Sequence, residues 1–596
     1  MEYRAPIADI LLSLNHAGQM QAGIDQGIYA DLADGFAQVI LQEAGKFSES
    51  VLDPINHSGD RQGARLNGHE VTTADGWRPA YEKWVEGGWN GLSAPEAFGG
   101  QDLPRLLNSA CLEMWSAANM AFTLCPVLGI GAIEALAAHG TPEIQQLYLP
   151  KLVSGEWTGT MNLTEPQAGS DLSQLRTRAV RAGDGTYKIT GQKIYITYGE
   201  HDMTSNIVHL VLARLPDAPA GTRGISLFVV PKFLVNADGS TGARNDLYCA
   251  GIEHKMGIHA SPTCTMIFGD KGGAVGYLIG EENRGLACMF TMMNNARLAT
   301  ALQGVGMADR ATQHAVQYAL GRKQGKAAGS QGSGPDPIIE HPDVRRNLLT
   351  MRTYTQAARA ICYATAAAID RAHRETDATA RQQASERAAL LTPLAKAFSS
   401  DIGNEVTSIG VQVHGGMGYM EETGAAQFMR DVRIVAIYEG TNGIQAIDLV
   451  QRKLGLGNGA AVAREIADMR ASLQELRASN DASFGRTAVR LGEAVDAFER
   501  ASHWLSAQLA ASPATALAGA TPYLRLFGLA RGGVFLAAQA LAAQTGALTD
   551  AGKDASKYVQ DARFFAENLV IAASGLELSI VEGGAFAADS SSNLVN

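Results

Sequence analysis

The stretch TYKITGQKIYITYG (186–199) is rich in β-branched and aromatic residues, which predicts a short β-strand. Three runs of the same character follow it: NIVHLVLARL (206–215), GISLFVVPK (224–232) and TCTMIFGD (263–270). Turns containing Gly, Pro or Asp separate these runs, and no helical pattern lies between them. Strands that follow one another without helices favour a β-sandwich or barrel over a Rossmann sheet.

Helical patterns flank this β region on both sides. Residues 141–157 open with Thr141, a preferred N-cap residue, and place Pro142 in the first turn. A Gly-rich segment, 323–337, interrupts the later helices and predicts a mobile loop. The predicted helices cover 31–47, 141–157, 285–320, 341–372 and 387–415.

The length of the chain requires several cores, because 596 residues are too many for one. GLGNGA (455–460) is typical of a linker, and the Ala-rich tail beyond it has helical periodicity. We therefore expect an α+β protein of four domains. They are an N-terminal helical domain (1–158), a central β-barrel or sandwich domain (159–285), a helical bundle domain (286–456) and a C-terminal helical extension (457–596).

The composition narrows the class of protein. The formal charge is −11 and no dense Lys/Arg block is present, which disfavours nucleic acid as a partner. Six scattered cysteines without a C-x-x-C pair argue against a disulfide framework or a zinc site and fit a reducing, cytoplasmic compartment. The apolar windows 121–140 and 523–544 are interpreted as buried helices or subunit interface in preference to membrane spans. The N-terminus lacks the pattern of a secretory signal.

One carboxylate stands out in the stretch VAIYEGTNGIQA (435–446). Glu439 lies between an apolar approach and the turn Gly440-Thr441-Asn442-Gly443. A poorly solvated carboxylate has a raised pKa and becomes a usable base near neutral pH. The alternative is that Glu439 merely opens a loop.

Three further stretches are rich in groups that contact ligands. In MNLTEPQAGSD (161–171), Gly169 and Ser170 would let backbone N–H groups and a hydroxyl approach an anion or a flat heterocycle, or form a simple turn. In KIYITYGEHD (193–202), Tyr195 and Thr197 share one face of a strand, or belong to an ordinary half-buried strand. QVHGGMGYME (412–421) places three glycines after a long helix, where a C-cap explains only one.

No P-loop is present. The nearest match to G-x-G-x-x-G, GIGAIE (129–134), lacks the third glycine and lies in a helical run. A Rossmann dinucleotide site is therefore not supported.

The motifs MNLTEPQAGSD, KIYITYGEHD, QVHGGMGYM and IYEGTNGIQ, in this order on helical, β and helical segments, resemble the flavin-dependent acyl-CoA dehydrogenases. The resemblance runs from about residue 40 to 455 and is most similar to the long bacterial branch, which includes 3-methylmercaptopropionyl-CoA dehydrogenases and fatty acyl-CoA enzymes. It implies a C-terminal four-helix bundle, an FAD cofactor and Glu439 as the catalytic base. Some members carry the base just before the Arg of a segment matching NNARLATA (294–301), but Ala296 occupies that position here.

The resemblance also implies the remaining site residues. The flavin end of FAD would contact Met161, Leu163, Thr164, Gly169, Ser170, Tyr195, Thr197, Thr441 and Asn442. The adenosine end would be held by a neighbouring subunit through Arg322, Gln412, Gly415 and Gly416. The substrate would contact Ser170, Asn294, Arg297 and Gly440.

The sequence departs from the family pattern at three of these places. Tyr195 replaces the usual Trp, Asn294 replaces an Asp found in many members, and the segment after Arg322 lacks the usual Phe. His341 is a further candidate for the site around Arg322. No metal site is implied.

Three activities remain open at this point. The first is dehydrogenation of an acyl-CoA to its trans-2-enoyl-CoA by a homodimer, favoured over a tetramer, that passes electrons to an electron-transfer flavoprotein. The second is an acyl-CoA oxidase, and the third is a non-catalytic assembly protein with the same fold. For the substrate, 3-methylmercaptopropionyl-CoA is favoured over a short- or medium-chain fatty acyl-CoA.

Overall fold

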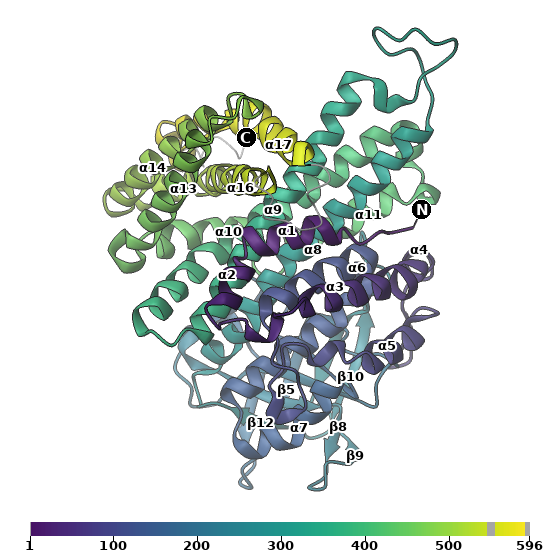
Figure 1. Cartoon of the computed structure of the whole chain (residues 1–596). Helices are drawn as coiled ribbons and strands as arrows, with labels where there is room; N and C mark the ends of the chain where they lie inside the picture. Colours follow the sequence, from purple (N-terminus) through teal and green to yellow (C-terminus); the bar gives the residue numbers. More distant parts are fainter. Residues whose placement is uncertain (1, 545–554, 590–596) are drawn as a thin grey trace.

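The computed structural model describes residues 2–544 and 555–589. The strands gather at the foot of the molecule, the long helices of residues 285–414 lie above them, and the C-terminal helices lie at the upper left (Figure 1). This arrangement confirms the predicted α+β architecture with an additional helical extension. All six cysteines are buried and free, as the expectation of no disulfide framework requires.

Helix α6 (Arg105–His139) is the central element of the N-terminal part. Nearly all of its residues are buried, which confirms that residues 121–140 form a buried helix. The backbone N–H groups of Arg105 and Leu106 both donate to the Asp370 carboxylate at 2.9 Å, so a distant helix caps this one. The other elements of this part are α1 (Ile7–His16), α2 (Met20–Asp25), α3 (Phe36–Phe47), α4 (Asp53–Gln62), β1 (Arg65–Asn67), β2 (Glu70–Thr72), α5 (Trp77–Glu86) and α7 (Pro142–Ser154).

The N-terminal part confirms one local prediction, corrects another and contains a hairpin that was not predicted. Thr141 caps α7 as predicted, since its side-chain oxygen accepts from the Ile144 N–H at 3.4 Å. Helix α3 begins at Phe36 and not at residue 31, because Gly35 takes a left-handed φ of +81° that breaks the helix before it. The antiparallel hairpin β1–β2 was not predicted.

Five strands of the central part close into a barrel. β5 pairs with β12, β12 with β7 and β7 with β6, and β4 closes the ring by pairing with both β5 and β6. β11 and β10 extend the sheet from β5, and β3 extends it from β6. The predicted β-barrel is confirmed. The strands are β3 (Trp157–Asn162), β4 (Arg178–Arg181), β5 (Tyr187–Thr197), β6 (Asn206–Arg214), β7 (Ile225–Pro231), β8 (Phe233–Val235), β9 (Thr241–Arg244), β10 (Leu247–Ile252), β11 (Thr263–Phe268) and β12 (Ala274–Ile279).

Three long helices, α8 (Gly285–Gly321), α9 (Pro342–Arg374) and α10 (Ala378–His414), pack together in the next part, and the short α11 (Ala425–Val432) and α12 (Asn442–Asp448) follow them. Helix α10 begins at Ala378 and not at residue 387, because the Asp377 carboxylate accepts from the Ala380 N–H at 2.7 Å and caps it there. The Gly-rich loop between α8 and α9 projects at the upper right of Figure 1.

The C-terminal extension packs against this bundle through α16 (Ala520–Gln544). Gly528 lies so close to the Phe398 ring on α10 that a Cβ atom there would come within 2.1 Å of it. Most of α16 is buried, which confirms the prediction that the apolar stripe of 523–544 is core. The other helices are α13 (Ala460–Ala478), α14 (Thr487–Ala511), α15 (Pro513–Ala518), α17 (Ala555–Phe564), α18 (Ala573–Val581) and α19 (Gly584–Asp589).

Within residues 2–544 and 555–589, three helical stretches are long and apolar enough to cross a membrane by length and composition alone. In the most apolar windows of α6 and α16, 89% and 83% of the residues are buried inside the fold. The corresponding share is 28% for the third stretch, Ala555–Val581. The first two stretches therefore pack inside the protein as buried helices.

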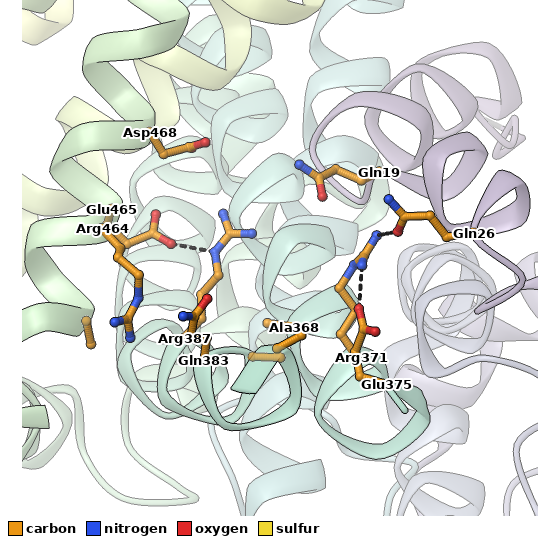
Figure 2. Close-up of a pocket in the computed structure, with 13 residues that line it drawn as sticks. Gln19, Gln26, Ala368, Arg371, Glu375, Gln383, Arg387, Arg464, Glu465 and Asp468 are labelled. Carbon is orange, nitrogen blue, oxygen red and sulfur yellow. Dashed lines mark hydrogen bonds and ion pairs between the residues drawn. The ribbon is translucent and has the colours of Figure 1, made fainter. Parts of the chain in front are cut away.

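A cavity of about 390 Å³ lies where the N-terminal helices, the bundle and the extension meet (Figure 2). Arg387 pairs with Glu465 of α13 across it, and Arg371 bonds to Glu375 and Gln26. A second cavity, of about 650 Å³, opens beside α4 and α11. Neither cavity is lined by a residue predicted to bind FAD or substrate.

Candidate active site

Glu439 lies on a tight turn between a 3₁₀ turn (Arg433–Ala436) and α12. Its φ is +57° and that of Gly440 is +85°, so two successive residues are left-handed, which is costly for a glutamate. The Gln445 side-chain amide donates to the carbonyl oxygens of Glu439 at 3.3 Å and Gly440 at 3.4 Å. The Thr441 side chain accepts from the Ile444 N–H and caps α12. These bonds hold the turn that carries Glu439.

The surroundings of Glu439 change its acidity. Burial raises the pKa of its carboxyl from 4.5 to about 7, and the nearby cations Arg297 and Lys396 oppose part of that rise. The residue keeps partial contact with solvent. A carboxyl group with this pKa is present in both protonation states near neutral pH, so it can accept and release a proton.

Arg297 reaches this site from α8. Burial lowers the pKa of its guanidinium, and the charges of Asp448 and Glu439 oppose the change. Its Nη1 donates to the Asn294 side-chain oxygen at 3.3 Å. The predicted substrate residues Asn294 and Arg297 therefore lie together on α8, and Arg297 is within electrostatic reach of the carboxylate. Ala296, where other members carry the base, is buried between them.

A polar network on α10 holds Asn442, the first residue of α12. The Asn442 side-chain amide donates to Asp401 at 2.7 Å and to the Ala397 carbonyl oxygen at 3.2 Å, and its oxygen accepts from Lys396 Nζ at 2.9 Å. Lys396 is fully buried. Neither Lys396 nor Asp401 was predicted as a site residue, although charged residues in the apolar helical run LLTPLAKAFSSDIG (390–403) are an unusual signal in the sequence.

The loop after β3 is fixed to strand β5. Lys193 Nζ donates to the Leu163 carbonyl oxygen at 2.9 Å and pairs with Glu165 at 2.9 Å. The Ile194 N–H donates to the Thr164 carbonyl oxygen at 3.0 Å. The two predicted flavin motifs, 161–171 and 193–202, are therefore brought together.

Tyr195 lies on a bulge of β5. Two residues of β5 stand opposite one residue of β11 between the pairs Met266–Lys193 and Cys264–Ile196. Tyr195 takes a φ of +60° there, and 60% of its surface is exposed, an unusual state for a tyrosine in a strand. The neighbouring Ile196 is buried, whereas Thr197 keeps partial exposure. The bulge thus presents an aromatic side chain outside the core.

The remaining predicted residues lie at the C-terminal ends of α8 and α10. The ring of His414 on α10 lies 4.4 Å from that of Tyr318 on α8, which joins the two ends. Arg322, Gln412, Gly415 and Gly416 are exposed there. Exposed apolar side chains surround them, namely Leu320, Met417, Tyr419 and Met420. His341 Nε2 contacts the Gln324 carbonyl oxygen at 2.8 Å in the loop that follows α8.

Comparison with known proteins identifies the family. Residues 37–156, 160–271 and 283–455 match the N-terminal, middle and C-terminal domains of acyl-CoA dehydrogenases, and residues 463–590 match an acetyl-CoA dehydrogenase C-terminal-like domain. The chain is 46% identical over 544 residues to the 3-methylmercaptopropionyl-CoA dehydrogenase of Ruegeria pomeroyi, covering 91% of this chain and 92% of that protein. The chain belongs to the acyl-CoA dehydrogenase family.

Two other acyl-CoA dehydrogenases match over most of their length. A butyryl-CoA dehydrogenase of Syntrophomonas wolfei is 35% identical, with 88% of each chain covered. The crystal structure of an acyl-CoA dehydrogenase complexed with FAD from Bacillus anthracis superposes with a TM-score of 0.73 at 22% identity, covering 93% of this chain and 90% of that one. The resemblance stated from four motifs is confirmed, and the protein is an FAD-dependent enzyme of the acyl-CoA dehydrogenase family.

Proposed function

We propose that the protein removes the α-proton of a short-chain acyl-CoA thioester with Glu439 and forms the trans-2-enoyl-CoA, with 3-methylmercaptopropionyl-CoA as the preferred substrate. The observation that carries this proposal is the state of Glu439: a carboxyl group with a pKa of about 7, on a left-handed turn that fixes its position. A base works best when its pKa lies near the working pH.

The turn also offers a donor for the substrate. The backbone N–H of Glu439 makes no hydrogen bond within residues 2–544 and 555–589, so it is free to donate to the thioester oxygen. Negative charge develops on that oxygen as the α-proton leaves, and a fixed donor stabilises it. Arg297 and Lys396 place positive charge near the Glu439 carboxyl, which keeps part of it ionised and able to act as a base.

The described residues fit FAD. Tyr195 presents a free aromatic side chain on its bulge, and a Cβ atom at Gly169, Gly415 or Gly416 would meet no atom within 4 Å, so room for a ligand is present beside each glycine. We assign the flavin end to Met161, Leu163, Thr164, Gly169, Ser170, Tyr195, Thr197, Thr441 and Asn442. When bound, FAD supplies the acceptor for the β-hydride of the substrate.

The positions of Arg322, Gln412, Gly415 and Gly416 support a homodimer. They are exposed at one end of α8 and α10, in a setting of exposed apolar side chains that a second subunit would cover. We assign the adenosine end of the partner's FAD to these residues. We also propose an electron-transfer flavoprotein as the acceptor and a cytoplasmic location.

The substrate assignment rests on the 46% identity to the Ruegeria pomeroyi enzyme. A thioether sulfur resembles a methylene in size and makes no strong hydrogen bond, so the same apolar site would also accept a short fatty acyl chain. The 35% identity to a butyryl-CoA dehydrogenase favours butyryl-CoA as the competing substrate.

Turnover measured with propionyl-, butyryl-, hexanoyl-, octanoyl- and 3-methylmercaptopropionyl-CoA would decide between them. We expect the largest kcat/KM for the sulfur compound. A larger kcat/KM for butyryl- or octanoyl-CoA would assign the protein to fatty acyl-CoA oxidation. Oxygen consumption by the substrate-reduced enzyme, in the absence of another acceptor, would identify it as an oxidase.

A further inference from the structure

The side chain of Asn442 hydrogen-bonds the turn that carries Glu439 to helix α10. Among the described residues, its side-chain bonds all go to α10: to Lys396, Asp401 and the Ala397 carbonyl oxygen. Asn442 is the first residue of α12 and lies three positions after the base. Movement of α10 at this point would therefore move the turn.

Lys396 has an environment that a structural role alone does not explain. Its side chain is fully buried, and the Asn442 oxygen is the one hydrogen-bond acceptor that its ammonium finds among the described residues. An ammonium group has three donors, and burying it with one partner is costly. A neutral Gln could supply the same bond to Asn442 without that cost.

The charged groups around the turn show what the ammonium interacts with. Burial lowers the pKa of Lys396 to about 8, and the charges of Glu439 and Asp401 oppose the change. Burial likewise raises the pKa of Asp401, so an alternating series of a base, a cation and a second acid runs from the turn into α10. The other charged or titratable groups near this series are Arg297 on α8, Asp448 and Arg452 after the turn, Tyr438 beside the base, Glu405 on α10 and Arg525 on α16.

From this geometry we infer that Lys396 is a positioning residue for the reaction, which holds the turn of Glu439 through Asn442 and places its positive charge beside that turn, and that Asp401, which accepts from the same Asn442, moderates its effect. This inference rests on the proposed role of Glu439 as the base. Lys396 itself does not transfer the substrate proton. Its charge, together with that of Arg297, lowers the pH above which Glu439 is ionised.

Three variants separate the effect of the Lys396 charge from the effect of its hydrogen bond to Asn442. Lys396→Met removes both, Lys396→Gln removes the charge and keeps a donor for Asn442, and Asp401→Asn keeps an acceptor for Asn442 while removing the negative charge. Each variant is prepared as the FAD-loaded enzyme, and the rate of anaerobic flavin reduction by substrate, per bound flavin, is measured against pH.

The Lys396 variants and the Asp401 variant should shift the pH profile of flavin reduction in opposite directions. An opposite charge a few ångströms away lowers the pKa of a carboxyl by about 1 unit or more, so the acid limb should move up by about one pH unit in Lys396→Met and Lys396→Gln. It should move down in Asp401→Asn, where the ammonium acts on Glu439 unopposed. A flavin absorbance equal to that of the wild type shows that each variant retains the fold and FAD.

The inference fails if Lys396→Gln and Asp401→Asn both keep the acid limb of the wild type, or if both move it in one direction. If Lys396→Met changes the rate of flavin reduction and Lys396→Gln keeps the wild-type rate, Lys396 has a hydrogen-bonding role alone. That result would also overturn the inference. If none of the acyl-CoA substrates reduces the flavin of the wild-type enzyme, the proposed function fails instead. The two failures are therefore distinct.

Discussion

Because the pKa of Glu439 is raised, kcat/KM should depend steeply on pH between pH 6 and 8, where an ordinary glutamate would leave it almost constant. With a pKa of about 7, about a tenth of the carboxyl groups are ionised at pH 6 and about nine tenths at pH 8. Because the ionised form is the base, kcat/KM should rise about tenfold between these pH values and then level off. A glutamate with the usual pKa near 4.5 is almost fully ionised at both, and the rate would change by only a few per cent.

The assay is anaerobic reduction of the enzyme-bound flavin at substrate concentrations well below KM, followed by the loss of visible flavin absorbance. The second-order rate constant is determined from pH 5.5 to 9, and the unfolding temperature is recorded at each pH to verify that the fold is intact. An acid limb with a midpoint near pH 7 is expected. A flat profile from pH 6 to 8 would show that the carboxyl is not shifted and would refute this reading of the site.

Two further predictions concern stability. Arg359→Met should cost about 3–5 kcal/mol, since it leaves the buried Glu113 carboxylate and the partly buried Asp309 carboxylate without the guanidinium that now pairs with both. Urea unfolding measures this loss, and a loss below about 1 kcal/mol would contradict the prediction. Gly528→Leu should cost about 1–3 kcal/mol by driving α16 away from Phe398, and should speed proteolytic release of the extension; an unchanged cleavage rate would show that the two helices are not in close contact.

The elements that the sequence predicted best are those whose pattern is local. The β-branched runs predicted strands β5, β6, β7 and β11, although β4 and β12, which complete the barrel, were not predicted. Thr141 and Pro142 marked the start of α7, and the lone acid before Gly440 marked the turn now seen at Glu439. Each of these features depends on residues adjacent in the chain, so propensity and turn chemistry were sufficient. The four-domain boundaries and the individual roles of the FAD and substrate residues stay predictions.

The features that the sequence could not reveal depend on partners far apart in the chain. The capping of α6 by Asp370 joins residues 264 and 265 positions apart, and the bulge at Tyr195 depends on how β5 aligns with β11. The contact of Lys396 with the turn of Glu439 also joins distant residues, so only the fold shows it, although a lysine within an apolar helical run was a visible signal in the sequence. The start of α10, in contrast, could have been predicted from the sequence, because Asp377 is a preferred N-cap residue. The predicted helix began at residue 387 because the apolar periodicity was given more weight.

The most direct test of the central claim is the Glu439→Gln variant. Gln keeps the size of the side chain and can adopt the same turn, but it cannot accept the α-proton. We predict that the purified variant carries FAD with the usual visible spectrum and that an excess of acyl-CoA leaves this spectrum unbleached under anaerobic conditions. Bleaching at a rate close to that of the wild type would contradict the assignment of Glu439 as the base.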